Sequence, residues 1–127
     1  MEPRPHSLAE IATRASNGNS FEFELAGFLH EFELRGGTDM LSAEPVSLTG
    51  SSAMGAIHDA YLAAVAVYLS ARLNSPSPSW VRKPERILPE PWFANPGRHM
   101  RALLLVESPA AFRERNLFVT ANALSVA

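Results

Sequence analysis

The chain has 127 residues, and one domain is expected because domains typically contain about 100–200 residues. Hydrophobic residues make up 46% and charged residues 19%, a composition typical of globular rather than disordered proteins. The formal net charge of -2 excludes a uniformly basic nucleic-acid-binding protein, and the absence of cysteine excludes a disulfide scaffold, a thiolate nucleophile and the usual structural zinc sites.

Two features of the sequence bear on location and partners. The first residues, MEPRPHS, lack the apolar core of a signal peptide, and the longest apolar stretch, 56–73, is interrupted by Asp59 and Arg72. We therefore expect a cytoplasmic protein with no membrane span. Residues 1–75 carry four arginines and nine acids, whereas residues 76–127 carry seven basic residues and four acids. This asymmetry predicts two faces of one domain that attract each other, which we favour, or a charged surface offered to a partner.

Two helices are predicted in the first third of the chain. The motif SLAE at 7–10 fits a capping box, so a helix should run over 8–16 before the sequence NGN ends it. Ser20 can cap a second helix over 21–35, whose apolar residues recur at helical spacing along one side. The acidic residues expected to face solvent on its other side are Glu22, Glu24, Glu31 and Glu33.

The strongest helical pattern runs from about Ser52 to Leu73, after a connector over 38–50 with at most one short turn at 39–43. Apolar residues occupy nearly every side of this helix, and small residues near its start allow another helix to approach closely. A helix that is apolar all round is normally buried. We therefore expect this helix to be the central one.

A proline-rich irregular segment is expected over about 74–97, and its aromatic residues should pack against the helices. We favour the rings of Pro91-Trp92-Phe93 as plugs of the core over anchors of an interface. Helices resume over 98–106 and 109–115, the second with Ser108 as its cap. No strand is predicted. The expected fold is all-α, a single compact domain spanning 1–127 with about five helices.

No motif in the sequence supports catalysis, a cofactor or a metal site. The chain lacks GxGxxG, a phosphate-binding loop, HExxH and GxSxG, and no two histidines are spaced for chelation from one helix. Asp59 can pair with Arg98 or Arg101, and we favour a pair near the surface over a buried one that would mark a site. We expect no catalytic residue, no cofactor and no metal.

A basic cluster next to an aromatic residue is the main candidate for a charged contact surface. Arg82, Lys83 and Arg86 follow Trp80 closely, and such a patch can hold single-stranded nucleic acid or an acidic protein surface. The predicted helix over 21–35 is acidic, so no helix-turn-helix with a basic recognition helix is evident. Binding of nucleic acid by this chain alone is therefore disfavoured.

Five short elements carry a resemblance to a known family. They are AYLAA at 60–64, WVxxPER at 80–86, PWF at 91–93, VESPAAFR at 106–113 and ANALS at 121–125. Together they resemble a family of small, uncharacterised bacterial proteins and are similar to C-terminal parts of some helix-turn-helix proteins. The resemblance implies that genes of this family lie next to nucleotidyltransferase-like genes, in arrangements similar to those of toxin–antitoxin pairs. It implies a partner-binding role and supplies no catalytic residue.

The function favoured by the sequence is a non-enzymatic protein-binding module, the small antitoxin-like partner in a bacterial two-gene system. One alternative is a transcriptional or nucleic-acid-binding accessory domain. Another is a small enzyme or ligand-binding protein with a pocket around His58, Asp59 and Arg101. The expected partner is another protein, with a homo-oligomer as a further option and no membrane contact. The residues predicted to contact the partner are Glu24, Glu31, Trp80, Arg82, Lys83, Arg86 and Trp92.

Overall fold

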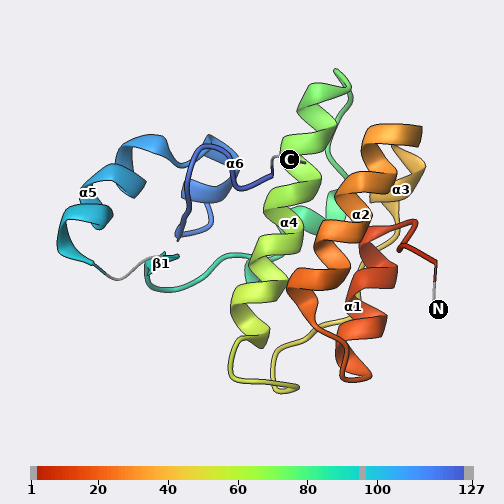
Figure 1. Ribbon diagram of the computed structural model, residues 1–127, viewed down its shortest axis with the longest axis horizontal. Helices are drawn as coiled ribbons and strands as arrows, with labels where there is room; N and C mark the ends of the chain where they lie inside the picture. The colour runs from red at the N-terminus through yellow and green to blue at the C-terminus, as the bar shows by residue number, and fades with distance from the viewer. Residues whose placement is uncertain (1–2, 95–96, 125–127) are drawn as a thin grey trace.

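Residues 3–94 and 97–124 are described by the computed structural model, and within them α-helix dominates. The first three helices lie on one side of a long central helix, and the last two helices and a small sheet lie on its other side (Figure 1). The all-α class expected from the sequence is confirmed. No helix in the described ranges is long and apolar enough to cross a membrane.

The first two helices begin and end where the sequence predicts. Helix α1 spans Leu8–Ser16 and α2 spans Phe21–Arg35. The Ser7 hydroxyl accepts the N–H of Glu10 at 3.0 Å, and the Ser20 hydroxyl accepts the N–H of Phe23 at 3.2 Å. These bonds satisfy backbone donors that a helix start leaves free. The two helices pack on each other, and the short helix α3, Asp39–Ser42, follows.

Helix α4, Gly55–Arg72, is the central element, as expected. It contacts the 3-10 turns η1 (Ser79–Arg82) and η2 (Pro84–Arg86), and also α6 (Ala110–Arg113). Its first residue lies against the backbone carbonyl of Leu48, where a Cβ atom would collide. The helix begins three residues after the predicted start at Ser52.

The second half of the chain contains a sheet that the sequence did not predict. Strand β1, Trp92–Phe93, pairs in parallel with β2, Leu117–Phe118. The expectation of no strand is therefore wrong, because this pairing joins two dipeptides that are distant in sequence. Helix α5, Arg98–Glu107, lies between the two strands in the chain and forms the far end of the molecule (Figure 1).

The buried hydroxyl of Ser108 fixes the chain that follows β2. It accepts the N–H of Val119 at 2.8 Å and lies 2.6 Å from the carbonyl oxygen of Leu104. The prediction that Ser108 is the N-cap of this helix is therefore wrong, because α6 begins only at Ala110. A turn over 121–124 ends the described chain.

Candidate binding groove

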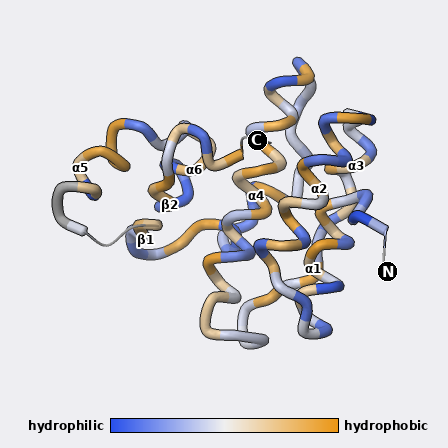
Figure 2. The backbone as a smooth tube through the Cα atoms, viewed as in Figure 1, coloured by the Kyte–Doolittle hydropathy of each residue, from blue (hydrophilic) through white to orange (hydrophobic). Residues whose placement is uncertain are grey.

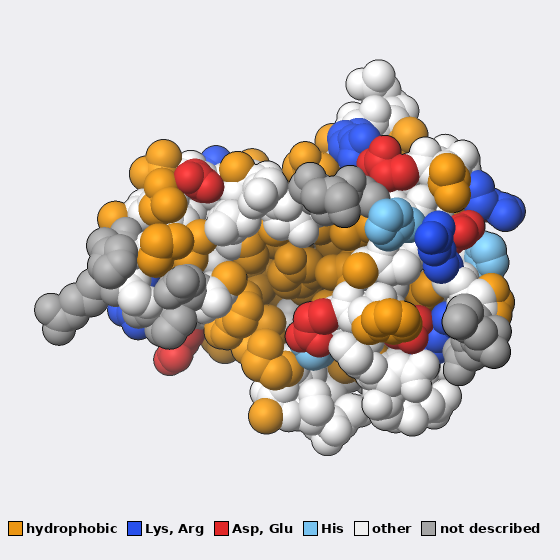
Figure 3. All heavy atoms as spheres, in the orientation of Figure 1, with side chains coloured by type: hydrophobic (Ala, Val, Ile, Leu, Met, Phe, Trp, Pro, Cys, Tyr) orange, Lys and Arg blue, Asp and Glu red, His pale blue; other side chains and the backbone are white. Residues whose placement is uncertain are grey.

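A hollow with apolar walls opens between α2 and α4 on one side and β1 with residues 119–123 on the other. It is visible as a recess of hydrophobic side chains on the face shown in Figure 3. Its volume is about 480 Å³, within the range of about 300–1,000 Å³ typical of ligand sites. We call it the groove; its walls include Phe21, Leu25, Ile57, Tyr61, Trp92 and Val119.

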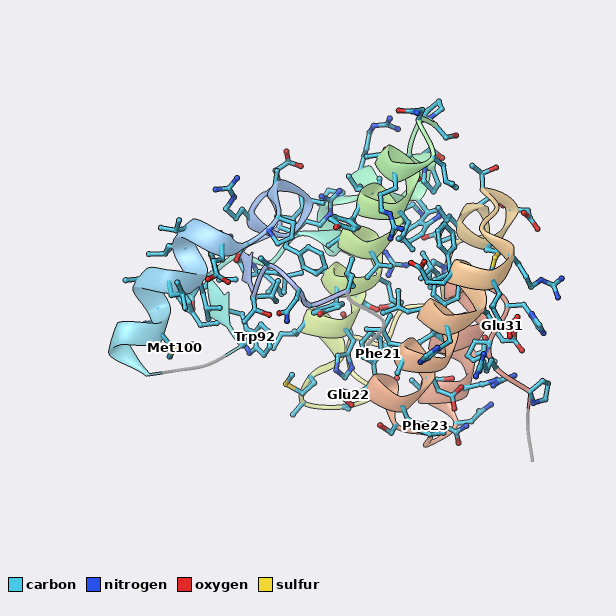
Figure 4. All side chains as sticks on the ribbon, turned by 45° about the horizontal axis from the view of Figure 1, so that its top comes forward. Phe21, Glu22, Phe23, Glu31, Trp92 and Met100 are labelled. Atoms are coloured by element: carbon cyan, nitrogen blue, oxygen red, sulfur yellow. The ribbon has the colours of Figure 1, made fainter. Side chains whose placement is uncertain are left out.

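Helical spacing brings the walls of the groove together. Phe21 and Leu25 lie one turn apart on α2, and Ile57 and Tyr61 lie one turn apart on α4. Residues four apart share one side of a helix. Trp92 enters from β1, where its backbone N–H donates to the carbonyl of Asn116 at 2.8 Å. Figure 4 shows Phe21 and Glu22 on α2, across from Trp92 on β1.

Contacts between aromatic rings join the walls of this part of the groove. The His58 imidazole lies flat against the Phe21 ring, with centroids 3.9 Å apart and planes at 4°. The Tyr61 ring meets Phe21 edge-on at 6.1 Å and Phe112 edge-on at 5.0 Å. Tyr61 therefore links α2 to α6 through α4, so the groove wall is anchored in the core.

The mouth of the groove carries one charged side chain among the described residues that line it. The Glu22 side chain is 77% exposed, and its Oε1 lies 3.8 Å from Nε2 of His58. Burial lowers the pKa of His58, and this effect outweighs the opposite influence of Glu22 and Asp59. Burial also raises the pKa of Tyr61 to about 12. No Lys or Arg is among the described residues that line the groove, so Glu22 sets its charge.

The structure places Glu24 inside the protein, so the prediction that it faces solvent is wrong. Its side chain is 6% exposed and accepts hydrogen bonds from Arg14 at 3.0 Å and from Asn19 at 3.2 Å. The cause is α1, which packs over this side of α2. Glu31 is also largely covered, at 15% exposure, and lies 3.7 Å from Arg4 and 3.5 Å from His6. Neither acid offers a free surface to a partner.

Only part of the predicted basic patch is exposed to solvent. Trp80 is buried, and its Nε1–H donates to the Leu41 carbonyl at 3.2 Å. The buried Arg86 guanidinium lies 4.9 Å from the centre of the Trp80 ring. Of the three basic residues, Arg82 and Lys83 are exposed. Lys83 binds Glu44 at 2.9 Å, which joins the basic half of the chain to the acidic half.

Asp59 is buried rather than near the surface, which corrects a second prediction. Its partner is Arg86, with Nη1 and Oδ1 3.6 Å apart, and not Arg101, whose guanidinium lies 5.2 Å from the centre of the Phe93 ring. The side chain of Arg98 lies outside the described residues. Asp59 therefore belongs to the core and not to a pocket with His58 and Arg101.

Trp92 is the one predicted contact residue that lines the groove, where it is half-buried. Trp92 also packs against the hydrophobic core, whereas Phe93, beside it, is partly buried and stacks on Phe118 with centroids 4.9 Å apart. Phe21 and Tyr61 also line the groove, although neither was predicted as a site residue. The only sequence feature that could have indicated them is the high number of apolar residues on the two long helices. A closed core would produce the same pattern.

The described residues contain no group of three or more His, Asp or Glu placed to hold a metal ion. The described residues that line the groove include no paired nucleophile and base; their polar side chains are His30, His58, Tyr61, Thr120 and the exposed Glu22. What the groove offers is an apolar surface with aromatic walls and one negative charge. No family model, curated protein or solved structure matches the chain, so the groove itself carries the functional argument.

Proposed function

We propose that this chain is a non-enzymatic protein-binding module that receives an apolar segment of another protein in the groove. The observation that carries the proposal is the open hollow of about 480 Å³ between α2, α4 and β1. Apolar surface left open to water is unfavourable, and a contiguous apolar recess commonly marks a site for a partner. Recognition of an amphipathic helix in such a groove is a recurring mode.

The chemistry of the groove defines the segment that fits it. The aromatic walls favour branched apolar or aromatic side chains, which gain most from burial against rings. Glu22 at the mouth favours a Lys or Arg on the same segment, next to the apolar residues. An acidic segment would be repelled there. The proposed partner therefore presents an apolar stripe flanked by a basic residue.

The biological setting is the second part of the proposal. We infer an antitoxin-like role as the small partner in a bacterial two-gene system. This part is supported by the resemblance of the elements around Trp80, Trp92 and 106–113, and by the absence of an evident catalytic arrangement in the groove. In this role the chain would bind the partner's segment and restrain its activity.

The test compares two tryptophan substitutions on α2. Ala26→Trp fills the groove from an exposed position in its wall, whereas Leu34→Trp adds the same ring at an exposed site that does not line it. Tagged wild-type and variant chains are used to recover partners from the native host. A partner that binds wild type and Leu34→Trp equally, and Ala26→Trp about tenfold more weakly, supports the proposal.

A photo-crosslinking residue at position 26 then identifies the bound segment. Crosslinks to an apolar segment that carries a basic residue are the expected result. Retention of the partner by Ala26→Trp, or crosslinks only to acidic or polar surface, would contradict a groove-mediated function. Circular dichroism of both variants checks that each remains folded.

A further inference from the structure

Helix α5 exposes an unusual amount of apolar surface. Leu103 is 43% exposed, Leu105 is 49% exposed and Val106 is 78% exposed, while Leu104 is fully buried. Figure 2 shows hydrophobic residues along α5, which lies at the end of the molecule away from α1 and α2. A helix that is apolar on most of its sides is normally covered. In this chain it packs mainly beside β2, so a large part of its surface is left for another contact.

The charges of α5 complement those of the groove. The sequence of α5 is RHMRALLLVE, with Arg98 and Arg101 before the apolar residues and a single acid, Glu107, at its end. The groove carries Glu22 at its mouth and no Lys or Arg among its described lining residues. An apolar run preceded by arginines is the type of segment that the groove favours.

The α5 helix of the same copy does not fill the groove. None of the α5 residues whose side chains are described is among those that line the groove, and β1 lies between the groove and the outer end of the molecule. The apolar helix and the apolar groove are therefore both open in one copy. A second copy related by a two-fold axis would cover both at once, because each chain would give its helix and receive the other.

We propose that α5 of a second copy lies in the groove, so that the chain forms a two-fold dimer with two identical contacts between α5 and the groove. This inference rests on the proposed function, since the same groove receives the segment of the other protein. It adds that the segment must displace α5 of the second copy in order to bind. The free chain is then a dimer whose binding groove is covered.

The first test measures the mass of the full chain by sedimentation over a wide range of concentrations. Wild type should sediment as a dimer. Ala26→Trp, which fills the groove, and Val106→Glu, which places a charge on the outer side of α5, should each weaken dimerisation about tenfold or more. Leu34→Trp, outside both surfaces, should behave as wild type. A wild-type monomer at every concentration would overturn the proposal.

The second test identifies which surfaces meet. A photo-crosslinker at position 105 is placed in chains mixed from unlabelled and heavy-isotope cultures. Crosslinks between differently labelled copies that join α5 to α2 or α4 are expected. Links from α5 to α5, or a dimer that survives Ala26→Trp, would refute the arrangement. Recovery of the other protein is scored separately, so a monomer that still binds it through the groove would contradict only this inference.

Discussion

Arg86 lies 3.6 Å from Asp59 in the interior, with the two side chains only 4% and 2% exposed. The pair joins η2 to α4, and its remaining hydrogen bonds fix the loop before α4. Asp59 accepts the N–H groups of Leu48 at 2.8 Å and Thr49 at 3.1 Å. Arg86 donates to the carbonyl of Pro45 at 2.7 Å. Two buried charges are tolerated here because both are paired and hydrogen-bonded.

Asp59→Asn should destabilise the protein strongly. The substitution removes the negative charge that faces Arg86. It also places an N–H donor next to backbone N–H groups that now donate hydrogen bonds to the Asp59 carboxylate. Removal of one partner of a buried pair typically costs about 3–5 kcal/mol. Glu33→Gln is the control, because its ion pair with Arg72 is exposed and should contribute less than about 1 kcal/mol. Urea unfolding measures both values, and similar losses for the two variants would contradict this account.

Trp80→Phe should lower the free energy of unfolding by about 1–3 kcal/mol, because the buried carbonyl of Leu41 loses its donor. The substitution also weakens the contact between the ring and the Arg86 guanidinium. Trp92→Phe makes the same change at a half-buried ring and should have a smaller effect. The chain has two tryptophans, so the Trp80→Phe variant also reports on the groove through Trp92 fluorescence alone. Equal losses would argue against the role of the Trp80 N–H.

The parts of the fold that the sequence predicts well depend on neighbouring residues. The caps at Ser7 and Ser20 act within one turn of the helices they begin, so the bounds of α1 and α2 could be read locally. The parallel pairing of Trp92 with Leu117 has no such signal. Two dipeptides are too short to show alternation, and their pairing depends on how α5 and α6 place the chain.

The candidate site was predicted less well because burial depends on packing between elements. Glu24 lies off the apolar side of α2, yet it is buried because α1 brings Arg14 against it. Arg86 reads as part of an exposed basic cluster, yet its partner Asp59 is 27 residues earlier in the chain. An apolar row such as Phe21 and Leu25 has the same pattern whether it faces a closed core or an open groove. The sequence therefore could not separate these two cases.

Gly55→Ala should be destabilising although alanine favours helices in general. A Cβ at this position would collide with the carbonyl of Leu48, whose N–H donates to the buried Asp59 carboxylate on α4 at 2.8 Å. Overpacking of this kind typically costs about 1–3 kcal/mol. Ala56→Ser, at the exposed neighbouring position, should be nearly neutral. Thermal unfolding compares the two variants; an unchanged or raised Tm for Gly55→Ala would show that the loop can move away from α4.

His58 should make the stability of the protein depend on pH. Its ordinary pKa is 6.5, and burial against Phe21 lowers the pKa in the folded state. The unfolded chain therefore binds the proton more readily, so the free energy of unfolding should fall as the pH drops below 6.5 and through the folded pKa.

His58→Phe, which keeps a ring beside Phe21, should flatten this dependence. Glu22→Gln should make it steeper, because the nearby carboxylate favours the protonated imidazole. Urea unfolding across this pH range measures all three chains, and parallel curves for wild type and His58→Phe would rule out His58 as the source.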